Sequence, residues 1–503
     1  MADSLVILTI LGTIIGIYTI LPDTKKFRLG YSIGSYEKWI LIISAFSILT
    51  QSLLYAYQSH QDPRASIPIL TFQVNKLFIV DLGISITAIV ILGTILKIFF
   101  DPKGVIQNIE YFTEKMEELW QKKHYTTFFS LIQENYEQMF HGNQIETNLL
   151  LQYADTKLND DLFTQIVVRY QPYLGLRIAL DSSIDLYSKN EYIDSFFKAL
   201  LQNKSSRLHY EIGNSQNSKI DYSRRYEIGE SNKILYSLLS DIRVSVNIAI
   251  WKPIGEGVIE ILDEQRKKEY DEYNMYQQKY SSCSKELYAN PVFAGITFFD
   301  LMVTEALYQK ISWHMWLYYY AHFVTKICRN YRESDLCEQD YEFPNTYALM
   351  LNQIIHNLID WIQVIEDDVD KIEHTLENQT CDHENGNIIK SSVICLSQCI
   401  RKIVISENVP DQLKMGFAHS CFSLYFDLSL KGGEIEKGYA AVFKDCITSK
   451  YLGDDNYSEY IGAMLGYLER FDTVPYEFEK DGRETIKSLQ STLHHIIEPS
   501  ETV

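Results

Sequence analysis

The sequence predicts an all-α protein in which three N-terminal transmembrane helices precede a large cytoplasmic helical body. Three long apolar stretches lie within the first 100 residues, and each is close to the ~20 residues that cross a bilayer as a helix. Beyond them the chain shows no sustained alternation of apolar and polar residues, which is the signal of a strand. Proline is scarce, at 11 in 503 residues, and this scarcity favours long helices.

We expect four parts along the chain. They are a transmembrane module at 1–103, a helical coupling region at 104–203, a polar loop or hairpin at 204–231 and a helical cytoplasmic body at 232–503. The formal net charge is −20, and the acidic excess lies beyond residue 100. Such a body disfavours non-specific adhesion to nucleic acid or to an anionic membrane, but it leaves room for a local basic pocket.

The first two apolar stretches are residues 5–21 and 39–57. The first has no preceding basic residues and no small-residue cleavage site, so we interpret it as a retained helix rather than a signal peptide. Gly12 and Gly16 lie one turn apart and offer a small-residue face for helix packing, although glycine is also common in membrane helices generally. Aromatic residues at both ends of the second stretch fit the two membrane interfaces.

The third apolar stretch, residues 77–100, contains Asp81 about one turn from its start. An ionisable residue inside a span is costly and usually faces other protein or water. In a symmetric oligomer, one Asp81 per subunit would form a carboxylate ring, an arrangement that selects cations. The alternative is that Asp81 pairs with a loop or span residue such as Lys76. The other residues predicted to line the pore are Ser85, Ala88 and Leu92.

Basic residues cluster after the first and after the third apolar stretch. The positive-inside rule then places the N-terminus outside and the C-terminal body in the cytoplasm, at the cell inner membrane. Eight cysteines in a chain of this length do not form a disulfide framework. Reduced thiols in a cytosolic body are the simplest interpretation.

After the membrane module, apolar residues recur at three- and four-residue spacing, which predicts amphipathic helices. In the coupling region we expect helices from residue 105 and at 144–157, 160–186 with a kink at Pro172, and 191–202. The aromatic segment 291–328 contains too many charges for a membrane span, so it is buried or lies at a subunit interface. The other predicted helices are 233–251, ending at a sharp break at 252–257, then 258–278, 347–376, 388–406, 412–428, 438–448, 457–470 and 483–497.

The chain carries no motif that indicates catalysis. Phosphate-binding loops, H-E-x-x-H and G-x-S-x-G are all absent from the sequence. Cys381, His383, Cys395 and Cys399 are ligand types for zinc, but their spacing fits no common zinc module. We therefore predict no enzyme activity, no metal and no cofactor, with Cys395 and Cys399 as buried thiols.

Several cationic residues have aromatic neighbours, and these clusters are the candidate ligand-binding residues. Together they could form an anion pocket in which bases stack on tyrosines and phosphates meet arginines. Ordinary ion pairing within the protein is the alternative for each cluster. The ligand-binding residues we predict are Arg169, Tyr173, Arg224, Arg225 and Tyr226, and further clusters lie at Arg329 with Arg332 and at Arg401 with Lys402.

Three membrane helices before a large, acidic, motif-poor helical body resemble the layout of membrane effectors of bacterial antiphage defence systems, in particular the Hailong type. The resemblance lies in the layout of the whole chain and assigns no residue. It implies a homo-oligomeric ion channel gated by a nucleotide or short nucleic-acid ligand that a partner enzyme makes. The alternative function is a membrane-anchored helical scaffold or regulator without a pore.

Overall fold

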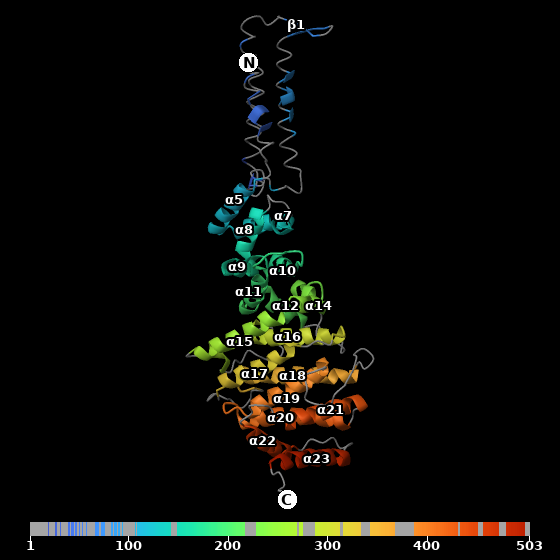
Figure 1. Ribbon diagram of the computed structural model, residues 1–503. Helices are drawn as coiled ribbons and strands as arrows, with labels where there is room; N and C mark the ends of the chain where they lie inside the picture. The colour runs from blue at the N-terminus through green and yellow to red at the C-terminus, as the bar shows by residue number, and fades with distance from the viewer. Residues whose placement is uncertain are drawn as a thin grey trace. The chain divides into compact units, whose positions relative to one another are not determined.

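The computed structural model in Figure 1 describes most of the chain beyond residue 105. The ranges described there are 108–141, 148–216, 228–268, 271–274, 287–311, 315–332, 343–367, 387–430, 433–450, 456–471 and 479–497. Before residue 108 it describes two strands and individual residues, most of them helical. The chain divides into two compact units, Met1–Tyr192 and Ile193–Val503, which we call unit 1 and unit 2.

The prediction of an all-α protein is confirmed, with one small exception. Strands β1 (Ser66–Ile69) and β2 (Phe72–Asn75) pair antiparallel in the segment between the second and third apolar stretches. Ile67 lies opposite Val74 in this hairpin. It is the only sheet in the part of the chain that the structure describes.

Unit 1 continues with short helices in the predicted coupling region. Asp160 caps α9 by accepting the Leu162 amide, and Pro172 occupies the first turn of α10, where a missing N–H costs nothing. The break expected at Pro172 is therefore present. The helices are α5 (Ile109–Gln121), α6 (Tyr125–Glu134), α7 (Tyr136–His141), α8 (Asn148–Leu158), α9 (Asp161–Tyr170), α10 (Pro172–Leu180) and α11 (Lys189–Gln202), the last of which crosses into unit 2.

The prediction of a polar loop or hairpin at 204–231 is wrong for its first half. Residues Arg207–Ser215 form helix α12, with Leu208 and Ile212 buried one turn apart. The polar residues of this helix are satisfied inside the protein rather than by water. Glu211 is fully buried, and its carboxylate accepts the amides of Ile234 and Leu235 at the start of the next helix, at 2.7 and 3.1 Å. Polarity here marks internal hydrogen bonding, which sequence alone does not distinguish from exposure.

The sharp break expected at 252–257 is also wrong. The chain instead breaks earlier, between α13 (Lys233–Leu239), α14 (Ile242–Asn247) and α15 (Trp251–Lys267). Pro253 lies in the first turn of α15, where proline is tolerated. Gly255 permits close packing, because a Cβ there would lie 2.4 Å from the Tyr319 ring.

The remaining helices of unit 2 agree with the predicted ranges to within a few residues, except that α18 ends earlier, at Asp367. Asn290 caps α16 by accepting the amides of Val292 and Phe293. The helices are α16 (Pro291–Tyr308), α17 (Tyr319–Asn330), α18 (Thr346–Asp367), α19 (Ile388–Val404), α20 (Asp411–Leu430), α21 (Glu434–Thr448), α22 (Tyr457–Glu469) and α23 (Glu479–Ile497), with short 3₁₀ turns at Glu272–Asn274, Leu287–Ala289 and Met315–Tyr318.

Helix α16 is the one described helix that is long and apolar enough to cross a membrane, and 83% of it is buried inside the protein. It is the core helix of unit 2, which confirms that this aromatic segment is buried. The three predicted N-terminal spans lie mostly outside the described residues. Their described residues, from Trp39 to Tyr57 and from Leu82 to Gly93, are helical.

Candidate functional site

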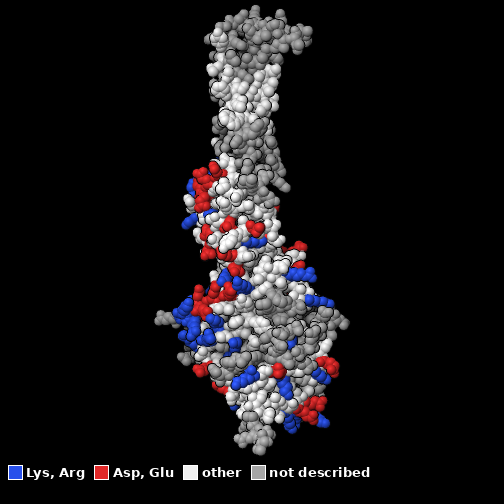
Figure 2. Space-filling model, viewed as in Figure 1, with Lys and Arg blue, Asp and Glu red and all other residues white. Residues whose placement is uncertain are grey.

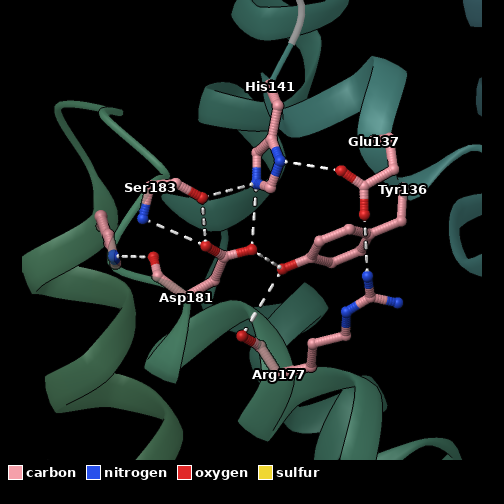
Figure 3. A network of polar contacts seen from close by, with 7 residues as sticks. Tyr136, Glu137, His141, Arg177, Asp181 and Ser183 are labelled. Atoms are coloured by element: carbon pink, nitrogen blue, oxygen red, sulfur yellow. Dashed lines mark hydrogen bonds and ion pairs between the residues drawn. The ribbon is translucent and has the colours of Figure 1, made fainter.

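A network of polar side chains in unit 1 joins helix α7, the end of α10 and the segment that leads into α11 (Figure 3). We call it the Asp181 network, because Asp181 accepts more of its hydrogen bonds than any other residue. Glu137 and His141 lie four residues apart in α7 and therefore share one face of that helix. Asp181 is the residue at which α10 ends, and its extended backbone turns the chain toward Ser183.

Donors surround Asp181 on several sides. Its Oδ2 lies 2.9 Å from the Tyr136 hydroxyl and 3.0 Å from His141 Nε2. Its Oδ1 accepts the Ser183 amide at 3.1 Å and the Ser183 hydroxyl as well, while its backbone oxygen accepts from Lys189 Nζ. Burial raises the pKa of Asp181, but the bonds from Ser183 and Tyr136 outweigh it and hold the pKa below its usual value. The carboxylate is therefore ionised at neutral pH.

Tyr136 and Arg177 contact each other within the Asp181 network. The Arg177 guanidinium lies 3.7 Å from the centre of the Tyr136 ring, a cation–π contact, and its Nη2 lies 3.0 Å from Glu137 Oε1. Burial, together with the bond to Asp181, raises the pKa of the Tyr136 hydroxyl, so this group remains a neutral donor. Because Arg177 and Glu137 are both well exposed, their ion pair contributes little to stability.

His141 has a carboxylate on each side of its ring. Nδ1 lies 3.0 Å from Glu137 Oε2, and Nε2 lies 3.0 Å from Asp181 Oδ2 and 3.1 Å from Ser183 Oγ. A neutral imidazole has one N–H and can donate to one of these carboxylates, whereas the charged ring donates to both. His141 thus joins α7 to the turn after α10.

The Ser183–His141–Glu137 distances match those of a nucleophile, base and orienting acid. The hydrogen bonds oppose that chemistry. The Ser183 hydroxyl donates to Asp181, and so does the Ser183 amide, which is the group that would otherwise stabilise an oxyanion. The arrangement therefore acts as a clamp between helices and not as an activated serine.

No protein-family model matches the chain. Neither a curated protein nor a solved structure matches it. The case for a function therefore rests on the residues of this chain and on the contacts that the structure gives them.

The structure places only part of the predicted ligand-binding set. Arg169 is exposed in α9 and lies 5.8 Å from the ring of its neighbour Tyr170, while Tyr173 is half-buried in the first turn of α10. Arg177, which is in the same helix as Tyr173 but is not one of the predicted ligand-binding residues, takes part in the Asp181 network. The other predicted ligand-binding residues, Arg224, Arg225 and Tyr226, lie outside the described residues.

Of the predicted membrane-site residues, only Ser85 is described. It is helical and exposed, on the same helical face as Leu82, Ile86 and Ile89. The remaining pore-lining and helix-packing residues, Asp81, Ala88, Leu92, Gly12 and Gly16, lie outside the described residues.

The cysteines that the structure describes follow the sequence prediction with one exception. Cys395 and Cys399 are buried and free, and Cys395 Sγ donates to the Leu317 carbonyl at 3.3 Å. The part of the chain that the structure describes holds no group of metal ligands, and Cys381 and His383 lie outside it. Cys446 is disulfide-bonded, so the expectation of reduced thiols throughout is wrong for this residue.

Proposed function

We propose that this protein is an oligomeric membrane effector, a ligand-gated ion channel controlled by its helical C-terminal body. The observation that carries the proposal is the set of large apolar side chains that N-terminal helical residues expose. Trp39, Ile42, Ile43 and Phe46 are each more than half exposed, and Phe46 reaches 72%. Further along the chain the exposed residues are Leu53, Tyr57, Leu82, Ile86, Ile89 and Val90.

The spacing of these residues supports a lipid-facing surface. Trp39, Ile42, Ile43 and Phe46 follow one face of a helix, and so do Leu82, Ile86 and Ile89. A soluble protein would turn such faces inward, because contiguous exposed apolar surface is unfavourable in water and marks an interaction site. Acyl chains or other membrane helices provide the environment that these side chains lack in a single copy of the chain.

Two threonine hydroxyls in these stretches are satisfied within their own helices. Thr50 Oγ1 donates to the Phe46 carbonyl at 2.9 Å, and Thr87 Oγ1 donates to the Gly83 carbonyl at 2.8 Å. Bonding back to a carbonyl one turn earlier satisfies a hydroxyl without water. This pattern suits a bilayer, where every polar group needs a partner inside the protein.

An aromatic cluster connects the membrane module to the helices that follow it. Phe27 and Tyr31, between the first two apolar stretches, pack on Tyr111 and Phe112 of α5, with ring centroids 5.2 to 6.0 Å apart. The Asn108 amide also donates to the Tyr31 carbonyl at 3.2 Å. The segment after the first stretch and the segment after the third are thus at one end of the module. This supports three crossings and offers a route for gating.

For orientation we propose the N-terminus outside and the C-terminal body in the cytoplasm, at a bacterial inner membrane. The clusters of basic residues support it, as do the free cysteines Cys328, Cys395, Cys399 and Cys421. The disulfide at Cys446 argues against a cytoplasmic location of the C-terminal body, because disulfides are rare in the cytosol. Labelling of single introduced cysteines from each side of spheroplasts would decide the orientation.

Conductance tests the channel. Purified protein in a planar bilayer should pass cations when its ligand is present, and Asp81→Asn should lower cation selectivity because it removes the proposed carboxylate ring. Ile89→Ala is the control within the same stretch, because it keeps the charge and lies on the proposed lipid-facing surface rather than in the pore. A protein that never conducts would leave the membrane-anchored scaffold as the function. Unchanged selectivity in Asp81→Asn would remove Asp81 from the pore.

A role in antiphage defence is supported by the layout alone, three apolar stretches followed by an acidic helical body. In that setting a partner enzyme would supply a nucleotide or short nucleic-acid ligand after infection. Expression at a level that opens the pore should then arrest growth. Asp81→Asn should relieve that arrest if the pore carries it.

A further inference from the structure

Helices α15 and α17 of unit 2 run in the same direction and end together. Gly255, near the start of α15, packs against Tyr319, at the start of α17. Towards the ends, Lys326 Nζ lies 2.7 Å from the Asp263 carboxylate. Asn330 Nδ2 donates to the Leu262 carbonyl at 2.7 Å. The last turns of the two helices are therefore neighbours.

Helix α19 joins them in the same direction. Cys395 in its first half bonds to Leu317, just before α17. At the other end of α19, Cys328 of α17 lies near Ser406, with which it forms a hydrogen bond, and near Lys402 and Lys414. Burial raises the pKa of the Cys328 thiol to about 12, although these three neighbours lower it. Burial also lowers the pKa of His322, and Lys402 and Lys326 add to that shift. These interactions place the C-terminal ends of α15, α17 and α19 close to one another.

Basic residues gather at this end, on a chain whose net charge is −20. Five of them are exposed, and Figure 2 shows a group of blue atoms at the C-terminal end of α15. We call this the basic end. Its exposed members are Arg266, Lys267, Lys268, Arg329 and Arg332, with Lys326 and Lys402 half-buried beside them.

Two ordinary explanations account for part of the basic end. Cations in the last turn of a helix complement its dipole, and this covers Arg266, Lys267 and Arg329. Ion pairing covers Lys326, which faces Asp263. Lys268 is the C-cap residue of α15, so the dipole covers it as well. Neither explanation accounts for Arg332, which is exposed and lies beyond the cap of α17.

Arg401 does not belong to the basic end, although Lys402 does. Its guanidinium is buried, lies 4.4 Å from the Tyr460 ring centre and donates to the Ser449 carbonyl at 2.7 Å. This residue holds the end of α21 in place. Tyr331, between the exposed Arg329 and Arg332, is buried too, so it is not a stacking platform.

We propose that the basic end binds a chain of phosphates, either a nucleic-acid strand or inorganic polyphosphate. Several exposed cations at one end suit a ligand with repeated charges better than a single anion. An anionic bilayer is the weaker fit, because α15, α17 and α19 expose no large apolar side chain that could enter it. The acidic remainder of the chain repels phosphate, so binding concentrates at this end.

This inference deepens the proposed function, since it gives the controlling body a ligand class and a place. Only the effect of phosphate binding on conductance depends on the proposed channel function. Binding is measured on its own, so a failure of the phosphate site and a failure of the channel are distinguishable.

Fluorescence anisotropy of a labelled 20-nucleotide DNA strand, with full-length protein in detergent, tests the site. We expect the triple variant Arg266→Glu, Lys267→Glu, Arg329→Glu to weaken binding by at least about tenfold at low salt and to flatten the salt dependence. The matched control is Lys437→Glu, Lys480→Glu, Lys487→Glu, which changes the net charge equally at exposed lysines of α21 and α23. The control should change affinity by less than about threefold.

Competition with inorganic polyphosphate distinguishes the two sources of the phosphate chain: the tighter competitor identifies the class. Equal loss of binding in the two triple variants would overturn the proposal, because the effect would then be one of net charge. So would a wild-type protein that binds neither probe at 50 mM salt, or one that binds anionic vesicles through these residues and not the strand. Circular dichroism of both triple variants confirms that each is folded.

Discussion

Two apolar segments of similar composition occupy different surroundings in this protein. Helix α16 in unit 2 is apolar along most of its length, apart from Asp300 and Glu305, and is buried within its own unit. The third N-terminal stretch in unit 1 is equally apolar, yet Leu82, Ile86, Ile89 and Val90 are exposed. Hydropathy therefore does not separate a core helix from a membrane helix. Contact with the rest of the chain separates the two, because unit 2 covers α16 whereas these four side chains of unit 1 are exposed.

This difference in burial predicts that truncating a side chain lowers the stability much more in α16 than in the third N-terminal stretch. Leu301→Ala in α16 should destabilise the protein by about 2 to 5 kcal/mol, because it leaves a cavity in a packed core. Ile89→Ala, whose side chain is 68% exposed, should change the free energy of unfolding by about 0.5 kcal/mol or less. Denaturant unfolding of both variants in one detergent measures the contrast. A loss at Ile89 as large as that at Leu301 would show that Ile89 is packed against a second copy.

A smaller effect is expected in the Asp181 network. Asp181→Asn keeps the shape of the side chain but removes the negative charge that faces His141 and Tyr136, and it should cost about 1 to 3 kcal/mol at pH 7. Thermal unfolding against wild type measures it.

The pH dependence of that cost follows from the lowered pKa of Asp181. A carboxyl whose pKa is lower in the folded state stabilises the fold above its unfolded pKa, near 3.8. That contribution is lost as the pH falls through the folded value. Wild type and Asp181→Asn should therefore converge in stability below about pH 3.8 and differ above it. A gap that stays constant down to pH 2 would contradict the assignment.

The smallest effect on stability is expected at Tyr187, in the same connection as Asp181. Its side chain is 91% exposed, so Tyr187→Ala should leave the unfolding free energy within about 0.5 kcal/mol. Sedimentation in detergent is the informative measurement. A fall in subunit number would mean that unit 1, unlike unit 2, uses exposed aromatics to assemble.

The helices were largely predictable, because their apolar spacing is local information. Asp411–Leu430 and Tyr457–Glu469 agree with their predicted ranges to within two residues. Two of the errors arise where long-range contacts decide the local structure. Glu211 makes a polar stretch helical by capping a distant helix, and Gly255 serves the packing of Tyr319 rather than a break.

The Asp181 network was not predictable, because its members come from residues about 40 positions apart. Glu137 and His141 offered a weak signal, since they share a helix face. Asp181 and Ser183 lay inside the predicted helix 160–186, whereas α10 ends at Leu180. Nothing in the sequence brought the two pairs together. The basic end was anticipated in part, through Arg329 and Arg332, while the contribution of α15 required the parallel packing of the helices.

The packing of Phe27 and Tyr31 on α5 also decides where the protein can be cut. A fragment that starts at Ile109 would lose both rings and uncover Phe112, which is fully buried in the intact chain. Such a fragment should aggregate even though the three apolar N-terminal stretches have been removed. A soluble fragment for crystallisation should instead begin near Ile193, where the second unit starts.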